Sequence, residues 1–176
     1  EPMSDLMAWN TDATRMPYRM HSEYLNRLFL NDDLAEGKYK VDDRTITLSA
    51  IDTPMFVVGT ERDHVAPWRS VHKIHLLTSA EITFVLTSGG HNAGIVSEPG
   101  HKGRSYRVMT REACGPSYDP EAWLERAEGK AGSWWTEWGA WLTARSGALS
   151  APPAMGAPDK GFTPLGDAPG RYVLEK

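Results

Sequence analysis

The sequence has 176 residues, of which 40% are hydrophobic and 24% charged, a composition typical of a globular protein of about one domain. Its net charge of −4 argues against a surface that binds nucleic acid, and the absence of an apolar run of about 18 residues argues against a membrane span. The single cysteine excludes an internal disulfide and fits a reducing compartment.

The first predicted elements are a helix and an extended segment. Pro17 suits the first turn of a helix, and apolar residues follow it at helical spacing, which predicts an amphipathic helix over 17–31. From Lys40 to Ala50 apolar and polar residues alternate, which predicts a half-buried extended segment.

The next elements predict a parallel sheet. The apolar runs 55–58 and 81–86 are typical of strands that are buried on both faces. A helix that opens at Pro67 lies between them. A strand, a helix and a second strand in this order form a crossover unit, and such sheets carry their chemistry in the loops beyond the carboxyl ends of the strands.

The remaining elements are two helices and a tail. Residues 97–118 show no clear period and predict irregular structure. Asp119 and Ser133 can cap helices over 120–128 and from 134 onward, and the second helix carries several Trp on one face as an expected anchor onto the sheet. Five Pro and four Gly between 150 and 170 predict an extended tail.

Two polar residues follow the two predicted strands at the same edge of the sheet. Asp63 comes shortly after the first strand, and His91 shortly after the second. A carboxylate can fix the tautomer of an imidazole, whose other nitrogen then takes a proton. This order matches the last two members of the nucleophile, acid and histidine set of the α/β-hydrolase fold. On spacing alone, a helix-capping Asp and a surface His explain the two residues about as well.

The nucleophile of such a set should precede the acid, in a Gly-x-Ser-x-Gly turn or its Cys version. The sequence contains no such pattern. Cys114 follows the histidine, with no predicted strand before it, so we expect an ordinary, partly buried thiol. The catalytic set is therefore incomplete in this chain.

Five segments carry a family resemblance: 9–17 together with His21, 61–68, 90–95, 132–138 and 168–173. In this order they resemble the polyhydroxyalkanoate synthases, and the first segment resembles part of their cap region. The resemblance is strongest to the single-subunit enzymes that polymerise short (R)-3-hydroxyacyl-CoA thioesters.

The resemblance implies the C-terminal portion of an α/β-hydrolase fold. It implies the end of a cap region at 1–40, half of the catalytic core at 41–149 and a Pro/Gly-rich tail at 150–176. Asp63 and His91 then correspond to two members of a Cys-Asp-His set, whose Cys we expect upstream of Glu1. In the family the histidine generates the thiolate that attacks the CoA thioester, and the aspartate either orients the histidine or activates the hydroxyl of the next unit. His64 also matches the family pattern, which fits substrate binding or a structural role.

The implied activity is that of an acyltransferase that polymerises (R)-3-hydroxyacyl-CoA into polyhydroxyalkanoate with release of CoA. The chain alone should be inactive. We expect no metal or organic cofactor, because thioester exchange needs a nucleophile, a base and an oxyanion hole. The implied partners are the acyl-CoA, the growing polyester, the surface of a cytoplasmic granule and a second copy of the protein. An esterase or depolymerase of the same fold, and a non-catalytic module that binds granules or a synthase, remain alternatives.

Two further groups of residues have simpler interpretations. His72 and His75 have a spacing compatible with a metal site, but no third ligand lies within sequence reach. A basic stretch could serve CoA phosphates, although a solvated loop is the simpler interpretation. It consists of Lys102, Arg104, Arg107 and Arg111.

Overall fold

The computed structural model describes residues 15–167 and Gly170. The resemblance segments 9–14, 168–169 and 171–173 lie outside the described residues. Contacts divide the chain into two compact units, Glu1–Trp141 and Leu142–Lys176. The boundaries at residues 40 and 149 that the resemblance implies stay predictions.

The predicted helix over 17–31 is present, but its second half is wound more loosely. The α-helix α2 (Tyr18–Glu23) follows Pro17 and continues into the π-helix η1 (Tyr24–Leu30). Neither part contains a buried residue. Phe29 and Leu30 are among the most exposed apolar side chains. The helix is therefore confirmed, whereas its apolar side is not buried.

The extended segment predicted over 40–50 is wrong in part, because it is a hairpin followed by a short helix. Strand β1 (Tyr39–Val41) pairs antiparallel with β2 (Arg44–Ile46), and the 3₁₀-helix η2 (Leu48–Ala50) follows. The turn residues Asp42 and Asp43 have φ angles of 46° and 62°. A type I′ hairpin turn requires positive φ at both positions, which aspartate adopts more readily than most residues.

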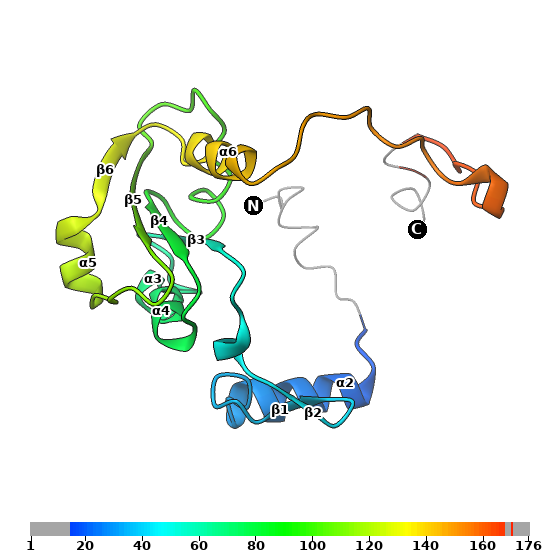
Figure 1. Cartoon of the computed structure of the whole chain (residues 1–176), viewed down its shortest axis with the longest axis horizontal. Helices are drawn as coiled ribbons and strands as arrows, with labels where there is room; N and C mark the ends of the chain where they lie inside the picture. The colour runs from blue at the N-terminus through cyan, green and yellow to red at the C-terminus, as the bar shows by residue number, and fades with distance from the viewer. Residues whose placement is uncertain (1–14, 168–169, 171–176) are drawn as a thin grey trace, which may run out of the picture. The chain divides into compact units, whose positions relative to one another are not determined.

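A four-stranded sheet forms the centre of the first unit (Figure 1). Its order is β3 (Met55–Thr60), β4 (Ile82–Thr87), β5 (Ser105–Arg111) and β6 (Glu128–Ala131). Strands β3 and β4 are parallel, while the pairs β4–β5 and β5–β6 are antiparallel. Helices α3 (Trp68–His72) and α4 (Ile74–Leu77) connect the parallel pair. The predicted crossover is confirmed, and this mixed sheet with its helices is an α/β fold.

The prediction of irregular structure over 97–118 is wrong, because β5 lies within it. Tyr106 and Val108 are buried, while Arg107 between them is exposed, which is the alternation of a strand with one covered face. Arg111 is buried although it is charged. Because Arg107 and Arg111 are charged, the sequence of this segment did not show the apolar alternation of a strand. Strand β6, which pairs with β5, carries almost no apolar residue and had no strand signal of its own.

Helices cover both faces of the sheet (Figure 1). Every residue of β4 is buried, because alternate residues point to opposite faces and both faces are packed. On one face β4 packs with residues of α3, α4 and α5 (Pro120–Arg126), including the fully buried Trp123. On the other face it packs with Trp134, which precedes α6 (Trp135–Ala144).

Both predicted helix caps are present. The Asp119 carboxylate accepts a hydrogen bond from the backbone N–H of Ala122 at 2.8 Å, and the Ser133 hydroxyl accepts one from the N–H of Trp135 at 3.0 Å. The Trp face of α6 is only partly an anchor. Trp134 is buried against the sheet, whereas Trp138 is 41% exposed.

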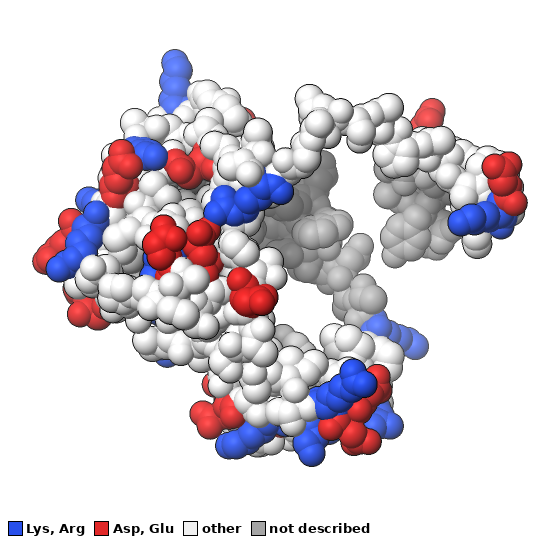
Figure 2. Space-filling model, in the orientation of Figure 1, with Lys and Arg blue, Asp and Glu red and all other residues white. Residues whose placement is uncertain are grey.

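In the second unit, the only regular element after α6 among the described residues is the 3₁₀-helix η3 (Pro158–Lys160). This agrees with the expectation that the Pro/Gly-rich tail, in its described part, contains neither an α-helix nor an interior strand. None of the described helices has the length and apolar character needed to cross a membrane. On the face in Figure 2, basic and acidic side chains are interspersed.

Candidate active site

The parallel pair β3–β4 brings Asp63 and His91 together. Thr60 at the end of β3 lies opposite Thr87 at the end of β4, so the loops that follow start side by side. Asp63 lies three residues beyond β3, and His91 four residues beyond β4. Nδ1 of the His91 ring lies 2.9 Å from Oδ2 of Asp63. The sequence therefore placed both residues correctly at one edge of the sheet.

The Asp63 carboxylate is held by four donors. Its Oδ1 accepts hydrogen bonds from the backbone N–H groups of Val65 and Ala66 at 2.9 and 2.8 Å. Its Oδ2 accepts one from the Thr60 hydroxyl at 3.3 Å and faces the His91 ring. The bond from Ala66, aided by His91 and Val65, lowers the pKa of Asp63 to about 2 despite the opposing effect of burial. Asp63 is therefore an anion at neutral pH.

An ionised Asp63 determines which nitrogen of His91 carries the proton. A carboxylate only accepts hydrogen bonds, so Nδ1 must be the donor and, in the neutral ring, Nε2 keeps its lone pair. The Asp63 side chain is 7% exposed, whereas that of His91 is 46% exposed. The pair thus joins a buried, fixed anion to an imidazole that solvent can reach. Such a ring can take a proton from another group at Nε2.

Glycines allow the His91 loop to lie against β3. A Cβ added at Gly94 would lie 2.6 Å from Cγ2 of Thr60, closer than a real Cβ contact. Gly89 has a φ of +114°, a conformation that other residues rarely adopt. Its carbonyl accepts a hydrogen bond from the backbone N–H of Arg62 at 2.9 Å, which ties the two site loops together.

No protein-family model matches the chain, but several curated proteins are similar to it over almost its whole length. It is 36% identical over 176 residues to poly(3-hydroxyalkanoate) polymerase 2 of Ectopseudomonas oleovorans, covering 99% of this chain and 30% of that protein. The identity is 38% over 175 residues to poly(3-hydroxyalkanoate) polymerase of Methylorubrum extorquens, covering 98% and 28%. Over almost its whole length, the chain is similar to part of the poly(3-hydroxyalkanoate) polymerases.

A third relative is the poly(3-hydroxyalkanoate) polymerase subunit PhaC of Cupriavidus necator, which is 36% identical over 173 residues. The chain spans less than a third of the length of these polymerases: 30%, 28% and 28% of the three. The resemblance of the sequence to polyhydroxyalkanoate synthases is thereby confirmed. The matched polymerases also contain a large part with no counterpart in this chain.

Cys114 lies at the opposite end of the sheet from the Asp63–His91 pair. Strand β5 runs antiparallel to β4, so Tyr106 lies opposite Thr87 and Arg111 opposite Ile82. Cys114 follows Arg111 and donates its backbone N–H to Ser79 O, just before β4 begins. Its side chain is exposed, so the expected partial burial is wrong. The separation along the sheet excludes Cys114 as a partner of His91 in this structure.

The structure also places the other predicted residues. His64 is exposed beside Asp63, and its role in substrate binding stays a prediction. His72 and His75 are buried with ring centroids 4.5 Å apart. In the described part of the chain, no three His, Cys, Asp or Glu are grouped so that they could hold a metal ion.

The interpretation of the basic stretch as a solvated loop is wrong for two of its arginines. The buried Arg111 donates hydrogen bonds to the carbonyls of His75, Thr78 and Ala80 at 2.6–2.8 Å. Arg107 donates to backbone carbonyls near α5. These guanidinium groups connect β5 to its neighbours, and the buried Arg111 is not free to bind the phosphates of a thioester substrate.

Sequence reasoning missed two residues near the pair. Thr60 contacts the Asp63 carboxylate, and Nη1 of Arg104 lies close to Gly89 in the His91 loop, 3.0 Å from the position of a Cβ on that glycine. An Asp side chain often accepts hydrogen bonds from backbone N–H groups two and three residues later. The contacts of Asp63 with Val65 and Ala66 could therefore have been predicted from the sequence. The position of Arg104 depends on strand pairing and could not be predicted in this way.

Proposed function

We propose that the chain is the C-terminal part of a poly(3-hydroxyalkanoate) polymerase with an α/β-hydrolase core, and that it supplies the acid and the histidine of a Cys-Asp-His set. The observation that carries this proposal is the 2.9 Å contact between Asp63 Oδ2 and His91 Nδ1 at the carboxyl edge of a parallel pair. The names of the relatives supply the reaction: polymerisation of 3-hydroxyalkanoate units.

The proposal gives each group a role that the contact between Asp63 and His91 supports. His91 Nε2 takes the proton of a cysteine thiol, and the thiolate attacks the carbonyl carbon of an (R)-3-hydroxyacyl-CoA. The C–S bond to CoA breaks, and the CoA sulfur leaves as a thiol with the proton from the His91 ring. The hydroxyl of another unit then attacks the acyl carbon while His91 accepts its proton. The C–S bond to the cysteine breaks, and the cysteine sulfur takes the proton back from the His91 ring. Asp63 keeps the ring in the Nδ1–H tautomer and stabilises its charged form.

The cysteine belongs to a segment of the polymerase that this chain does not contain. Among the described strands, β3 has a partner on one side only, β4. A further strand beside β3 would end next to the loop of Asp63, where its nucleophile could reach the exposed His91 ring. We therefore expect the part of the sheet that carries the nucleophile to continue from the β3 side. The exposed His64, next to Asp63, is then positioned to contact the substrate.

The activity implies the location and the partners. The substrate is a soluble (R)-3-hydroxyacyl-CoA and the product a water-insoluble polyester, so the polymerase works at the surface of a cytoplasmic granule. A second copy of the polymerase completes the set of proposed partners. Neither a nucleic acid nor a resident metal has a role in this chemistry.

The test is a comparison of CoA release from (R)-3-hydroxybutyryl-CoA by three proteins. A polymerase of full length that contains this sequence should release CoA and form polymer, and its His91→Ala variant should be slower by about 10³-fold or more. The isolated 176-residue chain should release none. CoA release by the isolated chain, or full activity of the His91→Ala variant, would overturn the proposal.

A further inference from the structure

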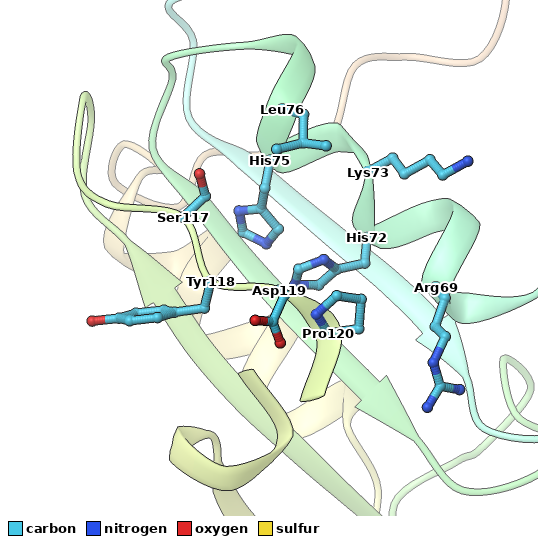
Figure 3. Close-up of a pocket in the computed structure, with 9 residues that line it drawn as sticks. All are labelled: Arg69, His72, Lys73, His75, Leu76, Ser117, Tyr118, Asp119 and Pro120. Carbon is cyan, nitrogen blue, oxygen red and sulfur yellow. The ribbon is translucent and has the colours of Figure 1, made fainter. Parts of the chain in front are cut away.

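A second histidine pair lines a cavity away from the candidate active site. The cavity has a volume of about 390 Å³ and lies between α3–α4 and the segment 117–120 that leads into α5. Figure 3 shows the rings of His72 and His75 pointing from the helices toward this segment. Because the segment follows β5, the cavity lies near the amino end of β4, opposite the end that carries His91. Its volume falls in the range of small-molecule sites.

The two imidazoles have unused hydrogen-bonding capacity. His72 and His75 are 4% and 5% exposed. Nε2 of His72 and both ring nitrogens of His75 are buried and have no hydrogen-bond partner among the described residues. Buried polar groups without partners are uncommon and costly, and an absent ligand is one physical explanation for them. Burial is the main reason that the pKa of His75 is lowered to about 4, so its ring is neutral at pH 7.

The charges around the cavity are balanced, which argues against an ionic ligand. The Arg69 guanidinium is paired with the Glu121 carboxylate at 2.9 Å. Asp119 and Lys73 both line the cavity, with opposite charges, and the Asp119 carboxylate also caps α5. Leu76, which is 76% exposed, contributes apolar surface. A neutral imidazole in a neutral, partly apolar cavity fits a neutral ligand with an aliphatic body and a hydrogen-bond acceptor.

We propose that this cavity binds a short uncharged aliphatic ester, whose carbonyl oxygen accepts a hydrogen bond from the ring N–H of His75. The ring packs against His72 and Phe84 and its nitrogens are buried, so this N–H reaches the cavity only when the ring turns about its Cβ–Cγ bond. The choice of an ester rests on the proposed function, because a segment of the polyester product has this chemistry. The cavity would then hold product at a distance from the reacting groups.

The test is isothermal titration calorimetry of the 176-residue chain with an uncharged probe, a trimer of (R)-3-hydroxybutyrate that is acetylated at one end and methylated at the other. Leu76→Asp puts a charge at the cavity without disturbing buried residues, and should weaken binding at least tenfold. His75→Phe removes the donor and should weaken it about five- to tenfold. The matched control is Leu149→Asp, since Leu149 is fully exposed outside the cavity, and it should bind as the unchanged chain does.

The inference would be overturned by no binding of the trimer, or by equal binding by the Leu76→Asp and Leu149→Asp chains. Tighter binding of the 3-hydroxybutyrate anion than of the trimer would also overturn it. The His91→Ala chain should bind the trimer normally, because His91 lies at the other end of the sheet. Failure of trimer binding leaves the test of CoA release untouched, so failure of this inference and failure of the proposed function are distinguishable.

Discussion

A histidine lies near each end of the central sheet, but the surroundings of the two rings are opposite. At the carboxyl end, the His91 ring is about half exposed and is bonded to a carboxylate that is itself held by backbone N–H groups. At the amino end, the His75 ring is buried against Phe84 and His72, and neither of its nitrogens has a partner among the described residues.

This difference decides what each histidine can do. A fixed anion gives His91 a defined tautomer and a free lone pair on the solvent side, which suits proton transfer. Burial without a charged partner keeps His75 neutral, which suits hydrogen bonding to an uncharged ligand. The environment, rather than the residue type, assigns the role. Each prediction below changes a group at one end of the sheet and states the expected effect on activity or stability.

The largest effect is expected from Asp63→Asn at the carboxyl end. The amide can donate a hydrogen bond to Nδ1 and so favour the wrong tautomer of His91, and it cannot stabilise the charged ring. In a full-length polymerase we expect the rate of CoA release to fall by about 10³- to 10⁴-fold. The matched control is Glu98→Gln, because Glu98 makes the same 2.9 Å contact with His101. An equal loss in both variants would contradict the assigned role of Asp63.

The next effect is expected at the amino end, where Arg111 holds the segment that follows α4. Arg111→Met would leave the carbonyls of His75, Thr78 and Ala80 without their charged donor. We expect the free energy of unfolding to fall by about 4 kcal/mol, measured by urea denaturation. Arg69→Met, which removes an exposed ion pair with Glu121, should cost about 0–1 kcal/mol. Similar losses would show that Arg111 does not anchor this segment.

Gly94→Ala tests the close contact that positions the His91 loop. The new methyl group would overlap Thr60, so the loop must move away from β3. We expect a loss of about 3 kcal/mol in the free energy of unfolding and a fall in CoA release by a full-length polymerase. Gly129→Ala is the control, since no atom lies within 4 Å of its added Cβ. Unchanged activity in Gly94→Ala would contradict the role of this contact.

The smallest effect is a pH dependence that originates at the amino end. In the folded chain the pKa of His75 is about 4, below its usual value of ~6.5 in an unfolded chain. Between these values only the unfolded chain binds the proton, so stability is full above pH ~6.5 and falls as the pH is lowered toward 4. From pH 7 to pH 5 we expect His75 to account for a loss of about 2 kcal/mol.

Urea denaturation of the chain and of its His75→Phe variant at both pH values measures this effect. The variant should lose correspondingly less stability between pH 7 and pH 5, whatever its stability at pH 7. Asp63 contributes in a different window: because its folded pKa is lowered, its contribution is present above pH ~4 and is lost only as the pH falls toward 2. An equal loss in both chains between pH 7 and pH 5 would contradict the buried, neutral state of His75.

The sequence was informative where local pattern and topology agree. The apolar runs at 55–58 and 81–86 predicted a parallel pair, and the order of strand, loop, helix and strand placed Asp63 and His91 at one edge. It was misleading where structure depends on distant partners. β6 exists because it pairs with β5, and the burial of Arg111 depends on carbonyls at 75–80. Neither the β5–β6 pairing nor the hydrogen bonds of Arg111 can be predicted from the spacing of apolar residues in those segments.

The central claim is that Asp63 holds the His91 ring with its proton on Nδ1 and a free lone pair on Nε2. Nitrogen NMR of the ¹⁵N-histidine-labelled chain at pH 8 tests it most directly, because the two ring nitrogens have different shifts when one carries the proton. The account predicts a His91 signal of the Nδ1–H form that shifts toward the Nε2–H form in Asp63→Asn. A His91 ring that is already in the Nε2–H form in the unchanged chain would contradict the account.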